Sequence, residues 1–339
     1  MNQQKTNLTA CLVGLGWWGR HLLSEASDSA VLKITSCVDP SPEALEFAKT
    51  RGLQHFKTLA DALAGGVFDA VIIATPHSMH RDQCLQALEA GKAVFCEKPL
   101  ALTAGDARRI TEEAAARGSV LGVGHERRFE PGFERIAELI AGGTLGRIIS
   151  VDANVSHNLM LRAKPGDWRL NAKEAPAGLW TGTGVHISDL IIASCGTPTD
   201  ARVELLSSST NFSGEEFVRV DLQLSTGVHA TVTTLACTPY YGRYTVFGDQ
   251  GWVELVTLAN VDGGQEAILT IAGSGGARAT ERIAPTRAVQ ANLEEWAKAV
   301  LGRATYRITA DQIVFNTAVL QAIATSMGRP AGYVGVAAA

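Results

Sequence analysis

The chain has 339 residues, of which 46% are hydrophobic and 19% are charged, and its formal net charge at pH 7 is −4. A chain of this length exceeds one typical domain, so we expect two domains, each with enough apolar residues for a core. The slight negative charge and the lack of a dense Lys/Arg block argue against a nucleic-acid partner. No apolar run approaches the roughly 20 residues that cross a bilayer, and the start of the chain is polar, so we expect no membrane partner and a cytoplasmic protein.

The first part of the chain alternates apolar, strand-like runs with amphipathic, helix-like segments. Strands are predicted at 8–13, 31–38, 69–74, 93–96 and 120–123, and helices near 17–27, 42–51, 79–90 and 104–117. Helix 42–51 also has a start signal, because Ser41 precedes Pro42 at the first helical position. Alternation on this scale indicates a doubly wound parallel sheet, and we assign residues 1–125 to an α/β domain.

The pattern changes after residue 125. Helices are predicted near 131–141, 180–194 and 289–301 and from 309 on, and strands at 147–156, 203–206, 216–224, 228–235, 243–247, 252–258 and 267–271. These stretches predict an α+β domain over 126–339 with a large, mostly antiparallel sheet. One face of that sheet needs a cover, which periodicity does not identify: it could be substrate, helices or another subunit. We expect the end of the chain, 332–339, to be a loosely held tail.

The six cysteines are scattered along the chain without any Cys-x-x-Cys pair. Several of them fall inside predicted strands, which is typical of buried, reduced thiols. Zinc sites need clustered ligands and disulfide frameworks belong to small exported domains, so we predict no metal site and no disulfide framework.

A glycine-rich turn follows the first predicted strand. Gly14, Gly16 and Gly19 form a Gly-x-Gly-x-x-Gly pattern between strand 8–13 and helix 17–27, and Asp39 follows twenty residues after the last of them. Such a turn lets the backbone approach a pyrophosphate, the helix N-terminus offers N–H groups, and an acid after the second strand reaches ribose hydroxyls. The sequence therefore predicts a dinucleotide site.

The acid also indicates which dinucleotide is bound. No Arg or Lys lies between Asp39 and Lys49 to neutralise a 2′-phosphate, and the carboxylate of Asp39 would repel one. NAD is therefore favoured over NADP.

Five further segments occur in one order along the chain. They are 70–80 (AVIIATPHSMH), 91–100 (GKAVFCEKPL), 124–131 (GHERRFEP), 167–169 (DWR) and 182–189 (GTGVHISD). In these segments the chain resembles the Gfo/Idh/MocA family of oxidoreductases, and Glu97-Lys98-Pro99 is the most specific element. The resemblance implies an N-terminal Rossmann domain, a C-terminal domain built on a large open sheet, a nicotinamide cofactor between the two, and hydride transfer to or from a carbinol carbon.

The resemblance also implies which residues hold the cofactor. It places the phosphates at Gly14, Gly16, Trp17, Trp18 and Gly19 and the adenine ribose at Asp39. It places the nicotinamide ribose near Ala74, Thr75, Pro76, His77, His80, Glu97 and Lys98, with a cis peptide bond before Pro99. Trp168 and Arg169 look like a pair that approaches the nicotinamide end in relatives.

Oxidising a secondary alcohol needs a group that accepts the hydroxyl proton and a cation or donor that stabilises the alkoxide. Within the family pattern, Lys98 and His186 fit these roles. Asp189 follows His186 by three residues on the predicted helix, where its carboxylate could fix the imidazole tautomer.

One position departs from the family pattern. Many members that oxidise polyols carry an Asp four residues before this histidine, and here that position is Gly182. Either the substrate is bulkier at this point, or Thr181 or Thr183 supplies a hydroxyl, or proton transfer falls to Lys98 with His186.

Two other features are candidates for substrate contacts. His157 follows strand 147–156, and Arg162 and Lys164 lie in the loop before the predicted helix 180–194. The two cations either meet an anionic group of the substrate or belong to a solvated loop or an intersubunit salt bridge.

These observations lead to one main function and two alternatives. The main one is an NAD-dependent dehydrogenase acting on a CH–OH group of a small sugar, cyclitol or sugar acid derivative. The alternatives are a cyclic diol dehydrogenase of aromatic breakdown and a catalytically weak, dinucleotide-binding regulatory protein. The family tendency and the uncovered sheet face favour a homodimer or homotetramer.

Overall fold

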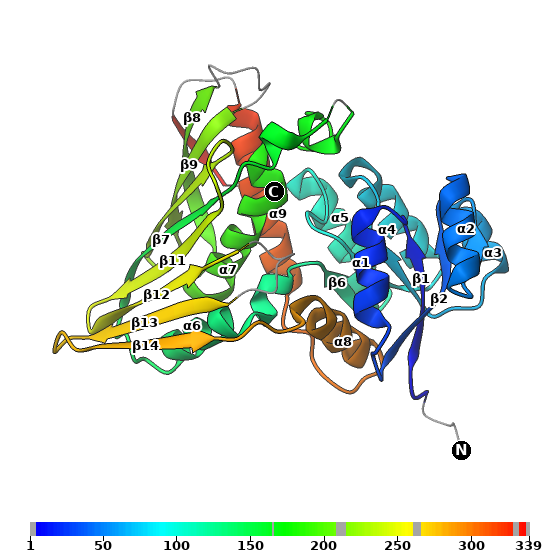
Figure 1. Cartoon of the computed structure of the whole chain (residues 1–339), viewed down its shortest axis with the longest axis horizontal. Helices are drawn as coiled ribbons and strands as arrows, with labels where there is room; N and C mark the ends of the chain where they lie inside the picture. Colours follow the sequence, from blue (N-terminus) through cyan, green and yellow to red (C-terminus); the bar gives the residue numbers. More distant parts are fainter. Residues whose placement is uncertain (1–4, 165, 208–214, 260–265, 328–331, 337–339) are drawn as a thin grey trace. The chain divides into compact units, whose positions relative to one another are not determined.

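The computed structural model describes residues 5–164, 166–207, 215–259, 266–327 and 332–336, and Figure 1 labels their helices and strands. The chain divides into two compact units. Unit 1 comprises Met1–Ala101, Gly105–Glu126 and Arg287–Ala310, and unit 2 comprises Leu102–Ala104, Arg127–Thr286 and Asp311–Ala339. Within the described residues, no helix is both long enough and apolar enough to span a membrane.

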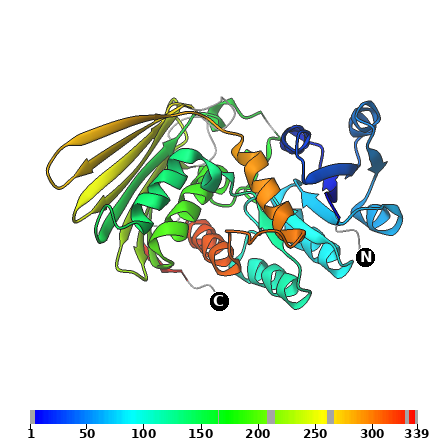
Figure 2. The ribbon, with the colours of Figure 1, turned by 90° about the horizontal axis from the view of Figure 1, so that it is seen from below.

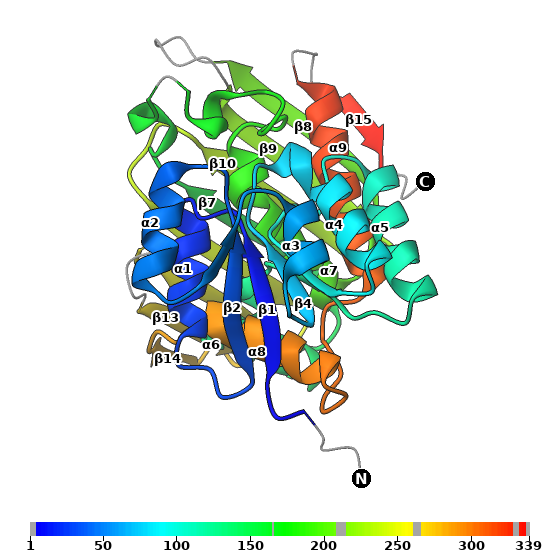
Figure 3. The same cartoon turned by 90° about the vertical axis from the view of Figure 1, so that its right-hand side faces the viewer.

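Unit 1 is built on a six-stranded sheet with the order β3-β2-β1-β4-β5-β6, and every neighbouring pair is parallel. The strands are β1 (Leu8–Val13), β2 (Leu32–Val38), β3 (Gln54–Phe56), β4 (Ala70–Ile73), β5 (Ala93–Cys96) and β6 (Leu121–Val123). Helices α1 (Trp17–Ala26), α2 (Pro42–Thr50), α3 (Leu59–Gly65), α4 (His80–Glu89), α5 (Ala104–Ala116) and α8 (Ala288–Val300) surround the sheet (Figure 3). The predicted doubly wound α/β architecture is confirmed.

The strand order of this sheet reverses between β1 and β4, since β1 leads outward to β3 and β4 leads outward to β6. Val13 at the end of β1 pairs with Ile73 at the end of β4, and Ile73 pairs with Cys96 at the end of β5. The loops that follow these three strands therefore share one edge of the sheet. In open α/β sheets, ligands bind at this carboxyl-terminal edge, where the strand order reverses.

Two short elements of unit 1 escape prediction from the sequence. Strand β3 has three residues at the edge of the sheet, and α3 has seven residues. Both are too short for a hydrophobic period to develop, because a strand or helix is recognised from repeats over about 11–18 residues.

Helix α8 belongs to unit 1, although the division at residue 125 assigns it to the second domain. The Trp296 ring packs edge-on against Phe95, with ring centroids 5.4 Å apart, and its Nε1 donates to the Val120 oxygen at 3.1 Å. A Cβ added to Gly122 of β6 would lie 2.7 Å from this indole. Gly122 thus leaves space for α8 to pack against β5 and β6. No local sequence pattern predicts this contact.

Unit 2 is built on a nine-stranded sheet with the order β14-β13-β12-β11-β7-β10-β9-β8-β15. The strands are β7 (Ile148–Ser156), β8 (Pro198–Ser207), β9 (Glu215–Leu224), β10 (His229–Leu235), β11 (Tyr241–Gly248), β12 (Gly251–Thr257), β13 (Ala267–Gly273), β14 (Arg278–Ile283) and β15 (Gly332–Gly335). Among the described strands of this sheet, only the β7–β10 pair is parallel, so the predicted mostly antiparallel sheet is confirmed. The predicted loose tail is wrong for 332–335, because β15 pairs with β8, while 337–339 lie outside the described residues.

Three helices cover one face of this sheet (Figure 2). They are α6 (Pro131–Ala141), α7 (Val185–Cys195) and α9 (Ala310–Ser326). Alternate residues of β7, such as Val151 and Ala153, point into the core that these helices close. Asp152 between them lies on the other face, where it pairs with Arg243 of β11. No helix in the described part of unit 2 covers that second face.

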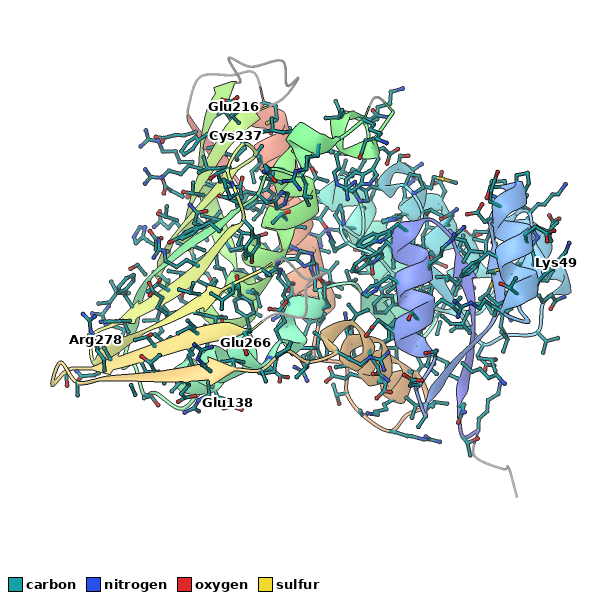
Figure 4. The ribbon with its side chains drawn as sticks, in the orientation of Figure 1. Lys49, Glu138, Glu216, Cys237, Glu266 and Arg278 are labelled. Atoms are coloured by element: carbon teal, nitrogen blue, oxygen red, sulfur yellow. The ribbon has the colours of Figure 1, made fainter. Side chains whose placement is uncertain are left out.

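The six cysteines are free thiols, of which five are buried. Cys237 after β10 is exposed (Figure 4), so the expectation of buried thiols is wrong for this one residue. Among the described residues, no group of three or more His, Cys, Asp and Glu side chains could hold a metal ion.

Candidate active site

The glycine-rich turn lies between β1 and α1, and its three glycines have different physical roles. Gly14 has φ +94°, and a Cβ there would lie 2.5 Å from the Ala74 oxygen. A Cβ on Gly19 would lie 1.9 Å from the Gly14 oxygen. Gly16, by contrast, has nothing within 4 Å of its Cβ position. The protein's own packing therefore requires Gly14 and Gly19, while Gly16 leaves open space at the start of α1.

The first turn of α1 can receive an anion at that open space. Gly16 caps the helix without a side-chain hydrogen bond, and the first turn contains no acidic residue. The helix N-terminus thus keeps its positive dipole and its N–H groups for a ligand. Trp17, the first residue of the helix, is 62% exposed, and its ring stacks on His21 with centroids 6.1 Å apart.

Asp39 follows β2 and is held by its neighbours. Its Oδ2 accepts a hydrogen bond from the Leu15 N–H at 2.8 Å, and its Oδ1 accepts from the Ser41 N–H at 2.9 Å and hydroxyl at 2.7 Å. Partial burial works to raise the pKa of this carboxyl, but the hydrogen bonds from Ser41 and Leu15 outweigh it, so the pKa is lowered. Asp39 is therefore a carboxylate at neutral pH, fixed beside the glycine turn.

The loop after β4 reaches the same edge of the sheet. The Ala74 N–H donates to the Val13 oxygen at 2.8 Å, and the Thr75 hydroxyl donates to Gln83 Oε1 at 2.6 Å. Pro76 then leads into the short helical turn His77–Met79, where the His77 ring meets His80 edge-on at 5.5 Å.

His80 does not fit the cofactor-contact role that the resemblance implies. It is fully buried, and its Nδ1 and Nε2 lie 2.8 Å from the Pro99 oxygen and 3.0 Å from the Thr75 oxygen. Because both ring nitrogens face backbone oxygens, we infer that His80 ties the loop after β4 to the loop after β5 and positions both.

Glu97 and Lys98 follow β5, and the expected cis peptide bond precedes Pro99. Glu97 is buried, and a Cβ on Gly124 would lie 2.5 Å from its Oε2. Burial raises the pKa of this carboxyl to about 6, although interactions with the Trp18 indole N–H and with Lys98 oppose the rise. Its Oε2 also accepts a hydrogen bond from the N–H of the half-buried Lys98 at 3.2 Å.

In unit 2, a π-helical turn over Trp180–Gly184 leads into α7, whose second residue is His186. Gly184 is required here, since a Cβ on it would lie 2.3 Å from the fully buried Trp180 ring. His186 is 4% exposed. Asn316 of α9 holds this end of α7, because its Nδ2 donates to the Val185 oxygen at 3.0 Å.

The Asp189 carboxylate binds a buried arginine, and its expected role of orienting His186 stays a prediction. Arg128 donates from Nε to Asp189 Oδ2 at 2.7 Å and from Nη2 to Oδ1 at 2.6 Å, so the guanidinium takes both carboxylate oxygens. Spacing along the helix places Asp189 one turn from His186, and the buried cation that binds its carboxylate comes from a different segment.

The two threonines of the π-helical turn differ in what their hydroxyls do. The fully buried Thr181 accepts a hydrogen bond from the Ala177 N–H at 3.1 Å. Thr183 Oγ1 lies 2.9 Å from His157 Nε2, while His157 Nδ1 accepts from the Leu159 N–H at 3.4 Å. His157 Nε2 therefore carries the hydrogen and donates it, which leaves the Thr183 hydroxyl hydrogen for another acceptor.

Trp168 and Arg169 lie in a short helical turn of the long loop before α7. Asp167 caps this turn by accepting from the Arg169 N–H at 3.0 Å. The Arg169 guanidinium lies over the Trp168 ring at 4.6 Å. Arg162 and Lys164 of the same loop are exposed. Contact of these cations with an anionic substrate group stays a prediction, as does their place in a solvated loop or an intersubunit salt bridge.

Comparison with known proteins assigns both units. Residues 8–125 match the model "Oxidoreductase family, NAD-binding Rossmann fold", and residues 133–254 match "GFO/IDH/MocA C-terminal domain". The chain belongs to the Gfo/Idh/MocA family of oxidoreductases. This family membership confirms the resemblance and makes unit 1 an NAD(P)-binding Rossmann fold.

Three similar proteins illustrate the family. The rhizopine catabolism protein MocA of Rhizobium meliloti is 27% identical over 326 residues, 94% of each chain. The 1,5-anhydro-D-fructose reductase of Ensifer adhaerens is 34% identical over 182 residues, but these cover only 53% of this chain and 54% of the reductase. The crystal structure of aldose-aldose oxidoreductase from Caulobacter crescentus has a TM-score of 0.84 at 24% identity, over 97% of this chain and 99% of that one, which shows the fold.

The residues of unit 1 fit the dinucleotide that this family binds. The space at Gly16 and the uncapped start of α1 would receive the pyrophosphate, and the fixed carboxylate of Asp39 would accept hydrogen bonds from a ribose. In unit 2, His186 can accept a proton, and the Thr183 hydroxyl can donate a hydrogen bond.

Sequence reasoning missed two residues that shape these sites. Gly124 makes room for the Glu97 carboxylate, and Arg128 takes the Asp189 carboxylate. Both lie in the segment GHERRFEP, whose consecutive charged residues are buried. A run of charges is normally solvated, so its position directly after a predicted strand inside a family motif was the available signal.

Proposed function

We propose that this chain is an NAD-dependent oxidoreductase that transfers hydride between the nicotinamide and a CH–OH carbon of a small hydroxylated substrate. One observation carries the proposal: the glycine turn, Thr75 and Lys98 follow three adjacent parallel strands and share the ligand-binding edge of unit 1. This arrangement supports a lysine that acts at the dinucleotide.

The reaction assigns a task to each residue. A secondary alcohol and NAD⁺ give a ketone, NADH and one proton, and the bound nicotinamide supplies the hydride acceptor. The Lys98 ammonium stabilises the alkoxide as the carbon–hydrogen bond breaks, and His186 accepts the hydroxyl proton and passes it to solvent. The Thr183 hydroxyl, ordered by His157, donates a hydrogen bond to a substrate oxygen.

The preference for NAD over NADP rests on Asp39. Its lowered pKa keeps it ionised, and its oxygens already face the turn that would hold the phosphates. A carboxylate at this point accepts hydrogen bonds from ribose hydroxyls and repels a 2′-phosphate.

The substrate class comes from the names of the relatives and from the protein's own polar groups. One relative is named for an anhydro sugar, which supports sugar or cyclitol derivatives. A cyclic diol is the alternative, and the absence of a side chain at Gly182 favours it over a ring that carries a hydroxyl on every carbon.

The test is NADH formation, followed at 340 nm, with NAD or NADP and a panel of sugars, cyclitols, sugar acids and cyclic diols. We expect turnover with NAD and one substrate class, and loss of turnover in Lys98→Ala. If the protein binds NADH but turns over no alcohol of the panel, the proposed dehydrogenase activity is wrong. A dinucleotide-binding regulatory protein is then favoured.

A further inference from the structure

Gly182 is the one position of the π-helical turn Trp180–Gly184 that is neither buried nor occupied by a side chain. It lies between Thr181 and Thr183, both of which are buried. His186 follows it by four residues in the next turn. Whatever lies against Gly182 therefore borders the groups to which the proposed function assigns the substrate.

The fold does not require glycine at this position. Gly182 does not belong to the glycines with positive φ. A Cβ added to it would meet only Trp168 Cη2 within 4 Å, at 3.6 Å, which is ordinary van der Waals contact. Gly184 in the same turn is different, because its Cβ would lie 2.3 Å from the Trp180 ring. Packing therefore requires glycine at position 184. At position 182 it does not, and the lack of a side chain there lets the Trp168 indole lie against the backbone.

The indole that lies against Gly182 is held in place. Asp167 accepts from the Arg169 N–H and pairs with the Arg169 guanidinium, with Nη1 3.2 Å from Oδ1. That guanidinium lies 4.6 Å from the centroid of the Trp168 ring. Stacking covers part of the ring and fixes its plane, and the six-membered edge of the indole is directed at the backbone of Gly182.

We propose that Gly182 and Trp168 form an apolar wall that selects ring alcohols with an unhydroxylated edge. The inference rests on the proposed function, because it concerns the part of the same substrate that does not react. A substrate hydroxyl against the indole would lose water without gaining a hydrogen-bond acceptor, whereas ring C–H groups pack well there. The favoured class is a cyclic vicinal diol with a hydrocarbon edge, over a ring that carries a hydroxyl on every carbon.

Two probes of one ring size test the wall: trans-cyclohexane-1,2-diol and myo-inositol. Both kcat/KM with NAD and the dissociation constant by calorimetry with NADH-saturated protein are measured. For the wild type we expect the diol to be favoured at least tenfold in both quantities. Trp168→Leu should reduce this ratio at least fivefold.

Gly182→Asp and Gly182→Leu form a matched pair, since both displace the indole but only aspartate supplies an acceptor. We expect Gly182→Asp to shift the ratio at least tenfold toward myo-inositol and Gly182→Leu to weaken both probes alike. Thermal unfolding of each variant shows whether it is folded.

Three results would overturn the wall. They are a wild-type preference for myo-inositol, the same ratio in Gly182→Asp as in the wild type, and a Trp168→Leu variant that loses NADH affinity at an unchanged ratio, which would make Trp168 a cofactor contact. The preference of the wild type between the two probes tests the proposed wall even if the variants do not fold. Binding of the diol without turnover would count against the proposed oxidation but would leave the wall intact, so the two failures are distinguishable.

Discussion

The guanidinium of Arg128 and the carboxylate of Asp189 form a bidentate ion pair inside unit 2, with side chains only 6% and 1% exposed. Removing one partner leaves the other charge buried and uncompensated, which costs about 3–5 kcal/mol. We therefore expect Arg128→Met and Asp189→Leu each to lower the free energy of unfolding by roughly that amount. Urea unfolding of the NADH-free protein measures it.

The double variant Arg128→Met/Asp189→Leu is the control for that prediction. It removes both charges, so it should be more stable than either single variant. Additive losses in the double variant would show that the two residues act independently.

The glycines of the dinucleotide turn provide a second matched pair. Gly19→Ala places a Cβ 1.9 Å from the Gly14 oxygen, so overpacking should destabilise the protein by about 1–3 kcal/mol even without cofactor. Gly16→Ala meets nothing within 4 Å, so stability should be unchanged while the NADH dissociation constant rises at least tenfold. Fluorescence titration with NADH and thermal unfolding separate the two effects. Unchanged NADH affinity in Gly16→Ala would place the phosphates elsewhere.

The carboxylate of Asp39 predicts cofactor choice. Asp39→Ser removes the charge that opposes a 2′-phosphate while keeping a hydrogen-bonding group near Leu15. We expect the ratio of kcat/KM for NAD to that for NADP to fall at least tenfold. A wild-type enzyme that already has the lower KM for NADP would contradict the assignment before any variant is made.

Much of this architecture follows from the sequence, because its strongest signals are local. Strand 8–13, the glycine turn and helix 17–27 are read from one continuous stretch, and the structure has β1 at Leu8–Val13 and α1 at Trp17–Ala26. Hydrophobic period and turn chemistry act over a few residues, so one sequence is enough to identify them.

The sequence does not show which side chains, far apart along the chain, contact each other in the fold. Helical spacing predicts that Asp189 serves His186, but it does not reveal that Arg128, 61 residues away, binds the Asp189 carboxylate. Trp296 lies in the C-terminal half of the chain, yet it packs on Phe95 of unit 1. The room at Gly182 is visible in the sequence, but its neighbour Trp168 is not, because contact across a fold depends on geometry that no period encodes.

Glu97 predicts how stability depends on pH. Burial raises the pKa of this carboxyl from its usual 4.5 to about 6, so the folded state holds its proton more tightly than the unfolded state does. The resulting stabilisation is complete below pH 4.5 and is lost as the pH rises through about 6. Glu97→Gln should remove this dependence and gain up to about 2 kcal/mol over the wild type between pH 4.5 and pH 7. Urea unfolding across this range tests it, and a difference between the two proteins that does not change with pH would contradict the assignment.

The second face of the unit 2 sheet predicts association. It carries the aromatic side chains of Tyr241 and Phe247, which are 46% and 37% exposed, together with ion pairs such as Arg219–Asp221. An antiparallel sheet can leave one face to solvent, but aromatic side chains are enriched at protein interfaces, and we propose that a second copy of the chain covers this face. Light scattering should give twice or four times the chain mass of 35.9 kDa. Phe247→Asp should shift the mass toward 35.9 kDa. A wild-type mass equal to that of one chain would refute the proposed oligomer.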